Sequence, residues 1–314
     1  MLHDIFLTLG RAARRGRCVA IAMTAVLIAL APGMAAAQFL MMPDSTNNRL
    51  VVFNEFNGAV VNANLFGLAA GTPIEALQVG NEIWISEQIG DRVSRWSLTG
   101  TPLGQLGGGP AGGLDNVRGM GIANGVLHVS NAGAANGAPG AALVRYSLTG
   151  APLGALPTAS SSSPFDVIDF QGGLLVSSSN ANDDLHRYSY AGASVGTFSN
   201  GATLNFAEQI DVTANGQLLV AGFSSNNVVR FDAGGNIVSS FTASGARGVW
   251  ELGNGNILWT SGAGASIYDQ ASGSSTLVYA GGGRFLAALV PEPATYLMWA
   301  AGLLLMLGAA RGRR

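Results

Sequence analysis

The sequence predicts an all-β fold, a six-bladed β-propeller over residues 38–289, flanked by an N-terminal signal helix and a C-terminal transmembrane helix. Three observations lead to this prediction. Glycine is abundant, at 45 of 314 residues, while only 11% of the residues are charged. A pattern of apolar strands and glycine turns recurs about every 43 residues, as in propeller blades. Two apolar segments beside basic clusters lie outside this repeat, at the two ends of the chain.

Residues 1–37 have the three parts of a secretory signal peptide. A basic region ends at Arg17, an uncharged apolar run covers residues 18–31, and small residues precede an expected cleavage between Ala37 and Gln38. The alternative is a membrane anchor, but fourteen helical residues span only about 21 Å of a roughly 30 Å hydrocarbon core. We therefore expect export. The pair Arg14 and Arg15 suggests twin-arginine export as an alternative, but Gly16 and Arg17 displace the apolar flank expected after such a pair, so we expect the general secretion machinery.

The body of the chain is an internal repeat. Its clearest copies are VSRWSLTGTPLG (93–104), LVRYSLTGAPLG (143–154), LHRYSYAGASVG (185–196) and VVRFDAGGNIVS (228–239). Together with two weaker copies they give six aromatic markers, at Phe53, Trp96, Tyr146, Tyr188, Phe231 and Tyr268. Successive markers lie 43, 50, 42, 43 and 37 residues apart, which predicts one four-stranded blade per copy.

Each unit also contains an earlier hairpin with a turn such as Asn-Gly or Gly-Gly, which allows the positive φ of tight turns. A β-sandwich is the alternative, but it would not repeat one aromatic and glycine pattern six times. The first unit begins at Phe39 with its second strand and lacks an innermost one. Residues 284–289 (RFLAAL) match the strands that begin near Arg118 and Arg247, so we expect them to close the ring.

This repeat resembles NHL-type six-bladed propellers, a group that includes lactonase-like proteins. The second strands depart from that pattern, because their usual final acidic residue is replaced at Ser86, Asn131, Ser177, Ala221 and Thr260. For lactonase-like members the resemblance implies a divalent metal with oxygen ligands at the mouth of the central channel. Glu208 and Asp166 are the residues best suited to such a metal here.

Residues 290–314 form a second targeting segment. An uncharged run, residues 294–310, is long enough for a marginal membrane span of about 26 Å. It lies between a proline-rich motif and a basic cluster, made of Pro291, Glu292, Pro293, Arg311, Arg313 and Arg314. The segment resembles the PEP-CTERM sorting signal of exopolysaccharide-producing bacteria. The resemblance implies anchorage in the inner membrane, processing by an exosortase, and delivery to the cell surface or extracellular matrix. An ordinary membrane anchor is the alternative.

Charge and cysteine usage exclude several functions. The chain has no Lys, and residues 38–290 hold nine Arg against sixteen Asp and Glu, so no basic stripe for nucleic acid exists. The single cysteine, Cys18, falls in the signal peptide. Only His128 and His186 remain in the body, which rules out a site of several histidines, and we interpret both as packing or surface residues.

Polar residues at the starts of the innermost strands are the best candidates for a site, because these positions converge on a propeller's channel. The main candidates are Asn116, Arg118, Asp166, Glu208 and Asp211, accompanied by Asp115, Gln209, Arg247 and Arg284. The competing interpretation is that the arginines only neutralise the carboxylates in a solvated channel. Loop residues such as Asp44, Asp91, Asn180 and Asn226 suit Ca²⁺ or sugar hydroxyls, but they also form turns.

Two glycine motifs carry little weight. The string GASVG around Ser194 matches a serine-hydrolase motif, but the equivalent repeat positions hold Pro102 and Pro152, so we expect a hairpin. Residues 107–113 (GGGPAGG) are interpreted as a loop between blades. The sequence therefore favours a non-enzymatic binding or structural module without a cofactor, with extracellular polysaccharide as a partner. One alternative is a metal-dependent hydrolase that uses channel carboxylates and a divalent cation. Another is a protein-interaction platform formed by the rim loops, which a contiguous exposed apolar patch would support.

Overall fold

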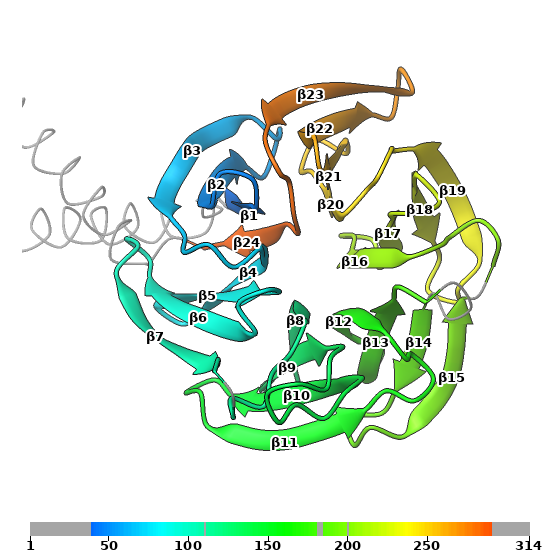
Figure 1. Cartoon of the computed structure of the whole chain (residues 1–314). Helices are drawn as coiled ribbons and strands as arrows, with labels where there is room; N and C mark the ends of the chain where they lie inside the picture. The colour runs from blue at the N-terminus through cyan, green and yellow to red at the C-terminus, as the bar shows by residue number, and fades with distance from the viewer. Residues whose placement is uncertain (1–38, 110, 181–184, 200, 291–314) are drawn as a thin grey trace, which may run out of the picture. The chain divides into compact units, whose positions relative to one another are not determined.

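The computed structural model describes residues 39–109, 111–180, 185–199 and 201–290. Within these residues, four-stranded antiparallel sheets form a ring of six blades around a central axis (Figure 1). The predicted all-β six-bladed propeller is therefore confirmed. The described residues contain no helix, and hence none that is long and apolar enough to cross a membrane. The signal peptide, its cleavage site at Gln38 and the sorting motif lie outside the described residues.

Each blade has an innermost, second, third and outer strand. The innermost strands are β4 (Pro73–Val79), β8 (Val117–Ala123), β12 (Pro164–Phe170), β16 (Ala207–Val212), β20 (Gly248–Glu251) and β24 (Ala287–Leu289). The second strands are β1 (Phe39–Asp44), β5 (Glu82–Glu87), β9 (Val126–Asn131), β13 (Gly173–Ser178), β17 (Leu218–Gly222) and β21 (Ile257–Ser261).

The third strands are β2 (Arg49–Asn54), β6 (Arg92–Ser97), β10 (Ala142–Ser147), β14 (Leu185–Tyr188), β18 (Asn227–Phe231) and β22 (Gly264–Asp269). The outer strands are β3 (Val60–Gly67), β7 (Pro102–Gly107), β11 (Pro152–Pro157), β15 (Ser194–Ser199), β19 (Ile237–Thr242) and β23 (Ser274–Ala280). All six aromatic markers lie on third strands, as the repeat predicted. We call β24 with β1–β3 blade 1, and number the following blades 2 to 6 in chain order.

Blade 1 joins the two ends of the propeller. Strand β24 pairs antiparallel with β1, with Met41 opposite Ala287 and Phe39 opposite Leu289 (Figure 1). Residues near the C-terminus therefore supply the innermost strand that the first repeat lacks, as predicted. Asp44 reinforces the closure, because its carboxylate accepts hydrogen bonds from the Tyr279 hydroxyl at 2.6 Å and the Gly282 amide at 2.9 Å.

The core is divided among the blade interfaces. Successive side chains of a strand point to opposite faces, and both faces of each inner strand are covered by a neighbouring blade. In β1, for example, Met41 packs in the cluster with blade 2, whereas Leu40 and Met42 pack in the cluster with blade 6. This explains why the second strands read as continuous apolar runs. Outer strands such as β3 and β19 are largely exposed.

Candidate functional site

The innermost strands place two successive rings of residues around the axis. The innermost strands align by their pairing register with the second strands, and residues at equivalent positions form a ring. The first ring consists of Ile74, Arg118, Phe165, Glu208, Arg247 and Arg284. The second ring is Glu75, Gly119, Asp166, Gln209, Gly248 and Phe285. Four of the predicted channel residues, Arg118, Glu208, Arg247 and Arg284, thus share one level at the channel mouth.

Polar side chains of the second ring bind to neighbouring strands. Asp166 accepts hydrogen bonds from the amides of Val167 and, across to blade 5, Ile210, both at 2.8 Å. Glu75 accepts from the Met120 amide of blade 3 in the same way. Burial raises the pKa of Asp166 to about 7, and burial together with the nearby Asp166 charge raises the pKa of Glu75 well above its ordinary value. Asp166 is therefore engaged in joining blades.

Gln209, the second-ring residue of the next blade, makes the same kind of link. Its Oε1 accepts hydrogen bonds from the amides of Val249 at 3.0 Å and Leu286 at 2.9 Å. Sequence reasoning named Gln209 and Asp166 as channel residues and did not name Glu75. The signal that could have found all three is their shared position, one residue after the first ring in each repeat.

Glu208 is the carboxylate of the first ring, and it is 2% exposed. The described residues form four ion pairs within 4.0 Å, and none involves Glu208. Its Oε2 is buried without a hydrogen-bond partner. Burial raises its pKa to about 7, although the charges of Arg247, Arg284 and Arg118 partly offset this rise. The arginines are therefore close enough to act on Glu208 electrostatically without neutralising it directly.

The three arginines differ in how they are held. Arg118, 8% exposed, donates through Nη1 to atoms of Ser163, Pro164 and Ser179, while its Nε is buried and unpartnered. Arg284 donates through Nε to the Ser45 hydroxyl at 2.9 Å. Arg247 has a buried, unpartnered Nε as well. Burial lowers the pKa of Arg118 and of Arg284 to about 10.

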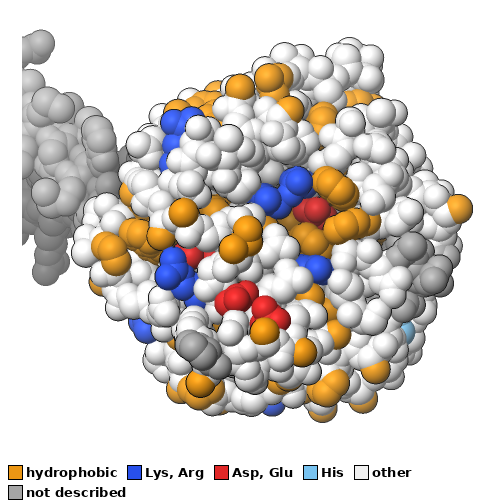
Figure 2. Space-filling view, viewed as in Figure 1, with side chains coloured by type: hydrophobic (Ala, Val, Ile, Leu, Met, Phe, Trp, Pro, Cys, Tyr) orange, Lys and Arg blue, Asp and Glu red, His pale blue; other side chains and the backbone are white. Residues whose placement is uncertain are grey.

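Aromatic side chains fill the axis and flank these charges. Ile74, Phe165 and Phe285 form a buried cluster on the axis, against which Phe206 packs. The guanidinium of Arg118 lies 4.6 Å from the ring centroid of Phe165. The expectation of a solvated channel is thus wrong at this level, because the apolar cluster occupies the axis. Figure 2 shows charged and hydrophobic side chains gathered at the centre of this face.

Phe206 and Phe223 extend the aromatic group towards solvent. Their ring centroids are 5.1 Å apart, and Arg247 lies 5.0 Å from the ring of Phe223. Both phenylalanines are half-buried. Phe206 has a φ of +54°, a conformation that is uncommon for a bulky residue and that clusters at ligand sites. We call the surface formed by Arg118, Phe206, Glu208, Phe223, Arg247 and Arg284 the mouth recess.

The other two main candidates lie elsewhere. Asn116 precedes β8. Its backbone N–H donates a hydrogen bond to the Asp91 carboxylate, and its side-chain Oδ1 accepts one from the Gln88 side chain. Asp211 lies further along β16 and lines a separate cavity of about 440 Å³ with Glu251 and Trp250. Burial raises the pKa of Asp211 to about 7. The five candidates therefore do not form one cluster. The described ranges contain no group of three or more His, Cys, Asp or Glu placed to hold a metal ion.

One contact joins two residues to which the sequence assigned no joint role. His186 on β14 is 5% exposed, and its Nε2 lies 2.7 Å from the Ser194 hydroxyl on the outer strand β15. This neighbouring-strand pair was not foreseen, because no spacing rule links the two residues. Ser194 follows a hairpin turn and lies on a strand, as expected from the repeat, and not on a strand-to-helix elbow.

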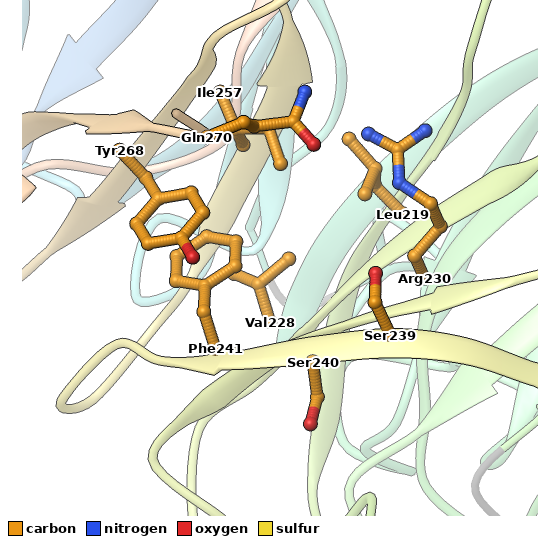
Figure 3. A pocket seen from close by; sticks show the side chains of 9 residues that line it. All are labelled: Leu219, Val228, Arg230, Ser239, Ser240, Phe241, Ile257, Tyr268 and Gln270. Atoms are coloured by element: carbon orange, nitrogen blue, oxygen red, sulfur yellow. The ribbon is translucent and has the colours of Figure 1, made fainter. Parts of the chain in front are cut away.

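A second cavity lies between blades 5 and 6. It has a volume of about 210 Å³, and Figure 3 shows its lining, formed by Leu219, Val228, Arg230, Ser239, Ser240, Phe241, Ile257, Tyr268 and Gln270. Phe241 and Tyr268 stack with parallel rings 3.8 Å apart. Arg230 is held by Glu251 at 2.8 Å and by Gln217 at 3.1 Å. We call this cavity the blade 5–6 pocket.

Comparison with known proteins supports the fold. The structure is similar to a chain in a nidogen/laminin complex, with a TM-score of 0.66 and 11% identity over 80% of this chain and 98% of that chain. It is also similar to a virginiamycin B lyase from Staphylococcus aureus (TM-score 0.53, 12% identity, 78% and 85% covered). The WD40 propeller of Doa1 gives a TM-score of 0.53 at 15% identity, covering 79% and 81%. No family model and no curated protein matches the sequence.

Proposed function

We propose that this chain is an exported propeller that acts as a non-enzymatic binding or structural module at the cell surface or in the extracellular matrix. Extracellular polysaccharide is the partner in this proposal. The observation that supports it is the blade 5–6 pocket, where the aromatic wall of Phe241 and Tyr268 meets hydroxyl, amide and guanidinium groups. Aromatic faces pack against the apolar faces of sugar rings, while such polar groups bond to hydroxyls.

The ligand is tested by affinity electrophoresis of the protein through gels that contain the exopolysaccharide of its own host. We expect the polymer to retard the wild type and Phe241→Ala to be retarded roughly tenfold more weakly, because the wall is lost. Phe56→Ala is the control, since Phe56 is 61% exposed in a turn of blade 1. Equal retardation of wild type and Phe241→Ala would remove this pocket from the proposal.

Localisation is proposed from the two terminal segments. Residues 1–37 support export, and the motif Pro291, Glu292, Pro293 before an apolar run supports processing by an exosortase-type enzyme. Expression in a host that has such an enzyme, followed by mass spectrometry of the released protein, tests both. We expect an N-terminus at Gln38 and loss of the C-terminal segment. Retention of Glu292→Ala in the membrane, beside released wild type, supports the sorting motif, and equal release contradicts it.

A metal-dependent hydrolase is the second candidate. It is favoured by Glu208, because a carboxyl with a pKa of about 7 suits a general acid or base at neutral pH. Thermal unfolding with Ca²⁺, Mg²⁺, Mn²⁺ and Zn²⁺ against a chelator tests it, since an ion that binds only the folded state raises the Tm. A rise with one ion that Glu208→Ala abolishes supports the enzyme. No rise with any ion contradicts it.

A further inference from the structure

We infer that the mouth recess is a binding site for an organic carboxylate. The carboxylate oxygens accept hydrogen bonds from Arg247, Arg284 and Arg118, and the ring or apolar body of the ligand packs against Phe206 and Phe223. This site lies at the channel mouth, whereas the blade 5–6 pocket lies between β18–β19 and β21–β22. The inference therefore stands independently of the proposed polysaccharide site.

The first argument is the hydrogen-bonding state of the recess. Oε2 of Glu208 and the Nε atoms of Arg118 and Arg247 are all buried, and none has a hydrogen-bond partner. Glu208 and Arg118 are also more than nine-tenths buried as whole residues. Buried polar atoms are nearly always paired, so three exceptions at one place point to a bound group that joins them. The absence of direct Arg to Glu208 pairs leaves these groups available to such a ligand.

The second argument is charge. Three guanidinium groups face one carboxyl, so the recess carries about two positive charges on a body that is otherwise acidic. Burial lowers the pKa of Arg118, and burial together with the Arg247 charge lowers the pKa of Arg284, so the Glu208 charge does not fully compensate these two guanidinium groups. A positive recess on a negative body attracts a small anion and does not attract a cation.

The third argument distinguishes a carboxylate from inorganic phosphate or sulfate. A planar guanidinium matches a planar carboxylate through parallel hydrogen bonds. The half-buried rings of Phe206 and Phe223 lie beside the charges, and they would gain nothing from an inorganic ion. A ligand with a ring or apolar body next to its carboxylate uses both features. The left-handed backbone at Phe206 holds one of these rings at the recess.

Glu208 makes binding dependent on pH. The charged groups that face it are Arg118 from β8, Arg247 before β20 and Arg284 before β24, while Asp166 on β12 is bonded to backbone amides one level further along its strand. A protonated Glu208 can donate to a carboxylate oxygen, whereas an ionised Glu208 repels it. Affinity should therefore fall as the pH rises through about 7.

Isothermal titration calorimetry tests the inference with two ring-bearing acids, D-glucuronate and phenylacetate, and with acetate, D-glucose and sulfate for comparison. We expect at least one ring-bearing acid to bind more tightly than all three comparison compounds. Arg247→Gln should weaken it by roughly 10- to 100-fold, because a charge-assisted hydrogen bond is lost. Arg187→Gln is the matched control, since Arg187 lies on the third strand of blade 4, away from the axis. Glu208→Gln should bind with the same affinity at pH 6 and pH 8.

The outcomes separate the sources of the ligand. Binding of glucuronate alone assigns the recess to the uronate residues of a polymer, and binding of phenylacetate alone assigns it to a free aromatic acid. Binding of sulfate or of glucose as tight as that of the tighter-binding acid overturns the inference. Unchanged affinity in Arg247→Gln also overturns it, provided that the unliganded variant keeps the wild-type Tm. The overturning results leave the gel test of Phe241→Ala unaffected, because they concern the recess and not the blade 5–6 pocket.

Discussion

Replacing Glu208 by Gln should stabilise the propeller at pH 8 and leave its stability unchanged near pH 4.5. The folded state raises the pKa of Glu208 from its ordinary 4.5 to about 7, so the native protein binds more protons than the unfolded chain between these values. Stability therefore falls as the pH rises through this window. At about 1.4 kcal/mol per pH unit, the ionised carboxylate costs on the order of 3 kcal/mol above pH 7. Gln has the shape of the protonated acid and cannot ionise.

Urea unfolding of both proteins at pH 4.5, 6 and 8 measures this difference. We expect the gap in the free energy of unfolding to widen from near zero to about 3 kcal/mol across the series. Glu55→Gln serves as the matched control, because Glu55 lies in a surface turn after β2. A variant that loses stability at pH 8 would refute the reasoning, since attraction by Arg118, Arg247 and Arg284 would then outweigh the burial of the charge.

Three further changes test the ring itself. Gly248→Ala should cost about 1–3 kcal/mol by urea unfolding, because its new Cβ would lie 2.5 Å from the carbonyl oxygen of Arg284. Gly262→Ala, with no atom within 4 Å, is the control, and equal midpoints would contradict the crowding. Burial raises the pKa of Asp44, but its hydrogen bonds outweigh burial and hold the pKa at about 2. The stability of the wild type should therefore fall as the pH drops below 4, and the stability of Asp44→Asn should fall less over the same range. Thermal unfolding between pH 2 and 5 measures this difference. Truncation before Arg284 removes β24 and should give aggregates in size-exclusion chromatography, whereas truncation after Val290 should give monomers. A monomeric form of the shorter protein would argue against ring closure by β24.

The repeat period and the strand pattern sufficed to predict the fold. The markers from Phe53 to Tyr268 repeat because every third strand faces the same environment between two blades. The closing strand could be predicted from the resemblance of residues 284–289 to the strands near Arg118 and Arg247. Within the innermost strands, the charged first-ring residues and the second-ring residues that join neighbouring blades are only one position apart in the sequence. Period alone does not resolve such an offset, and this is why Asp166 and Glu208 were expected to act together.

The aromatic part of the mouth could not be predicted. Phe206 and Phe223 lie in connections outside the repeat pattern, and their proximity depends on the folding of the turn between β17 and β18 against the start of β16. The blade 5–6 pocket was missed for a similar reason. Phe241 and Tyr268 occupy different strand positions in different blades, and only the packing of blade 5 on blade 6 stacks their rings.

Differences among the repeats are what allow one ring to have both a rigid axis and a charged mouth. Asp166 and Gln209 each extend to an amide of the following blade, which requires space at the neighbouring second-ring position. Glycine provides this space, because a Cβ on Gly119 would lie 2.7 Å from Asp166 Oδ1, and one on Gly248 would lie 3.0 Å from Gln209 Oε1. Six identical blades could not place a long polar side chain at one second-ring position and a glycine at the next. The second ring therefore fixes the strands, and the first-ring charges do not have to pair with one another to hold the fold together. This division leaves Glu208 and Arg247 available to a ligand.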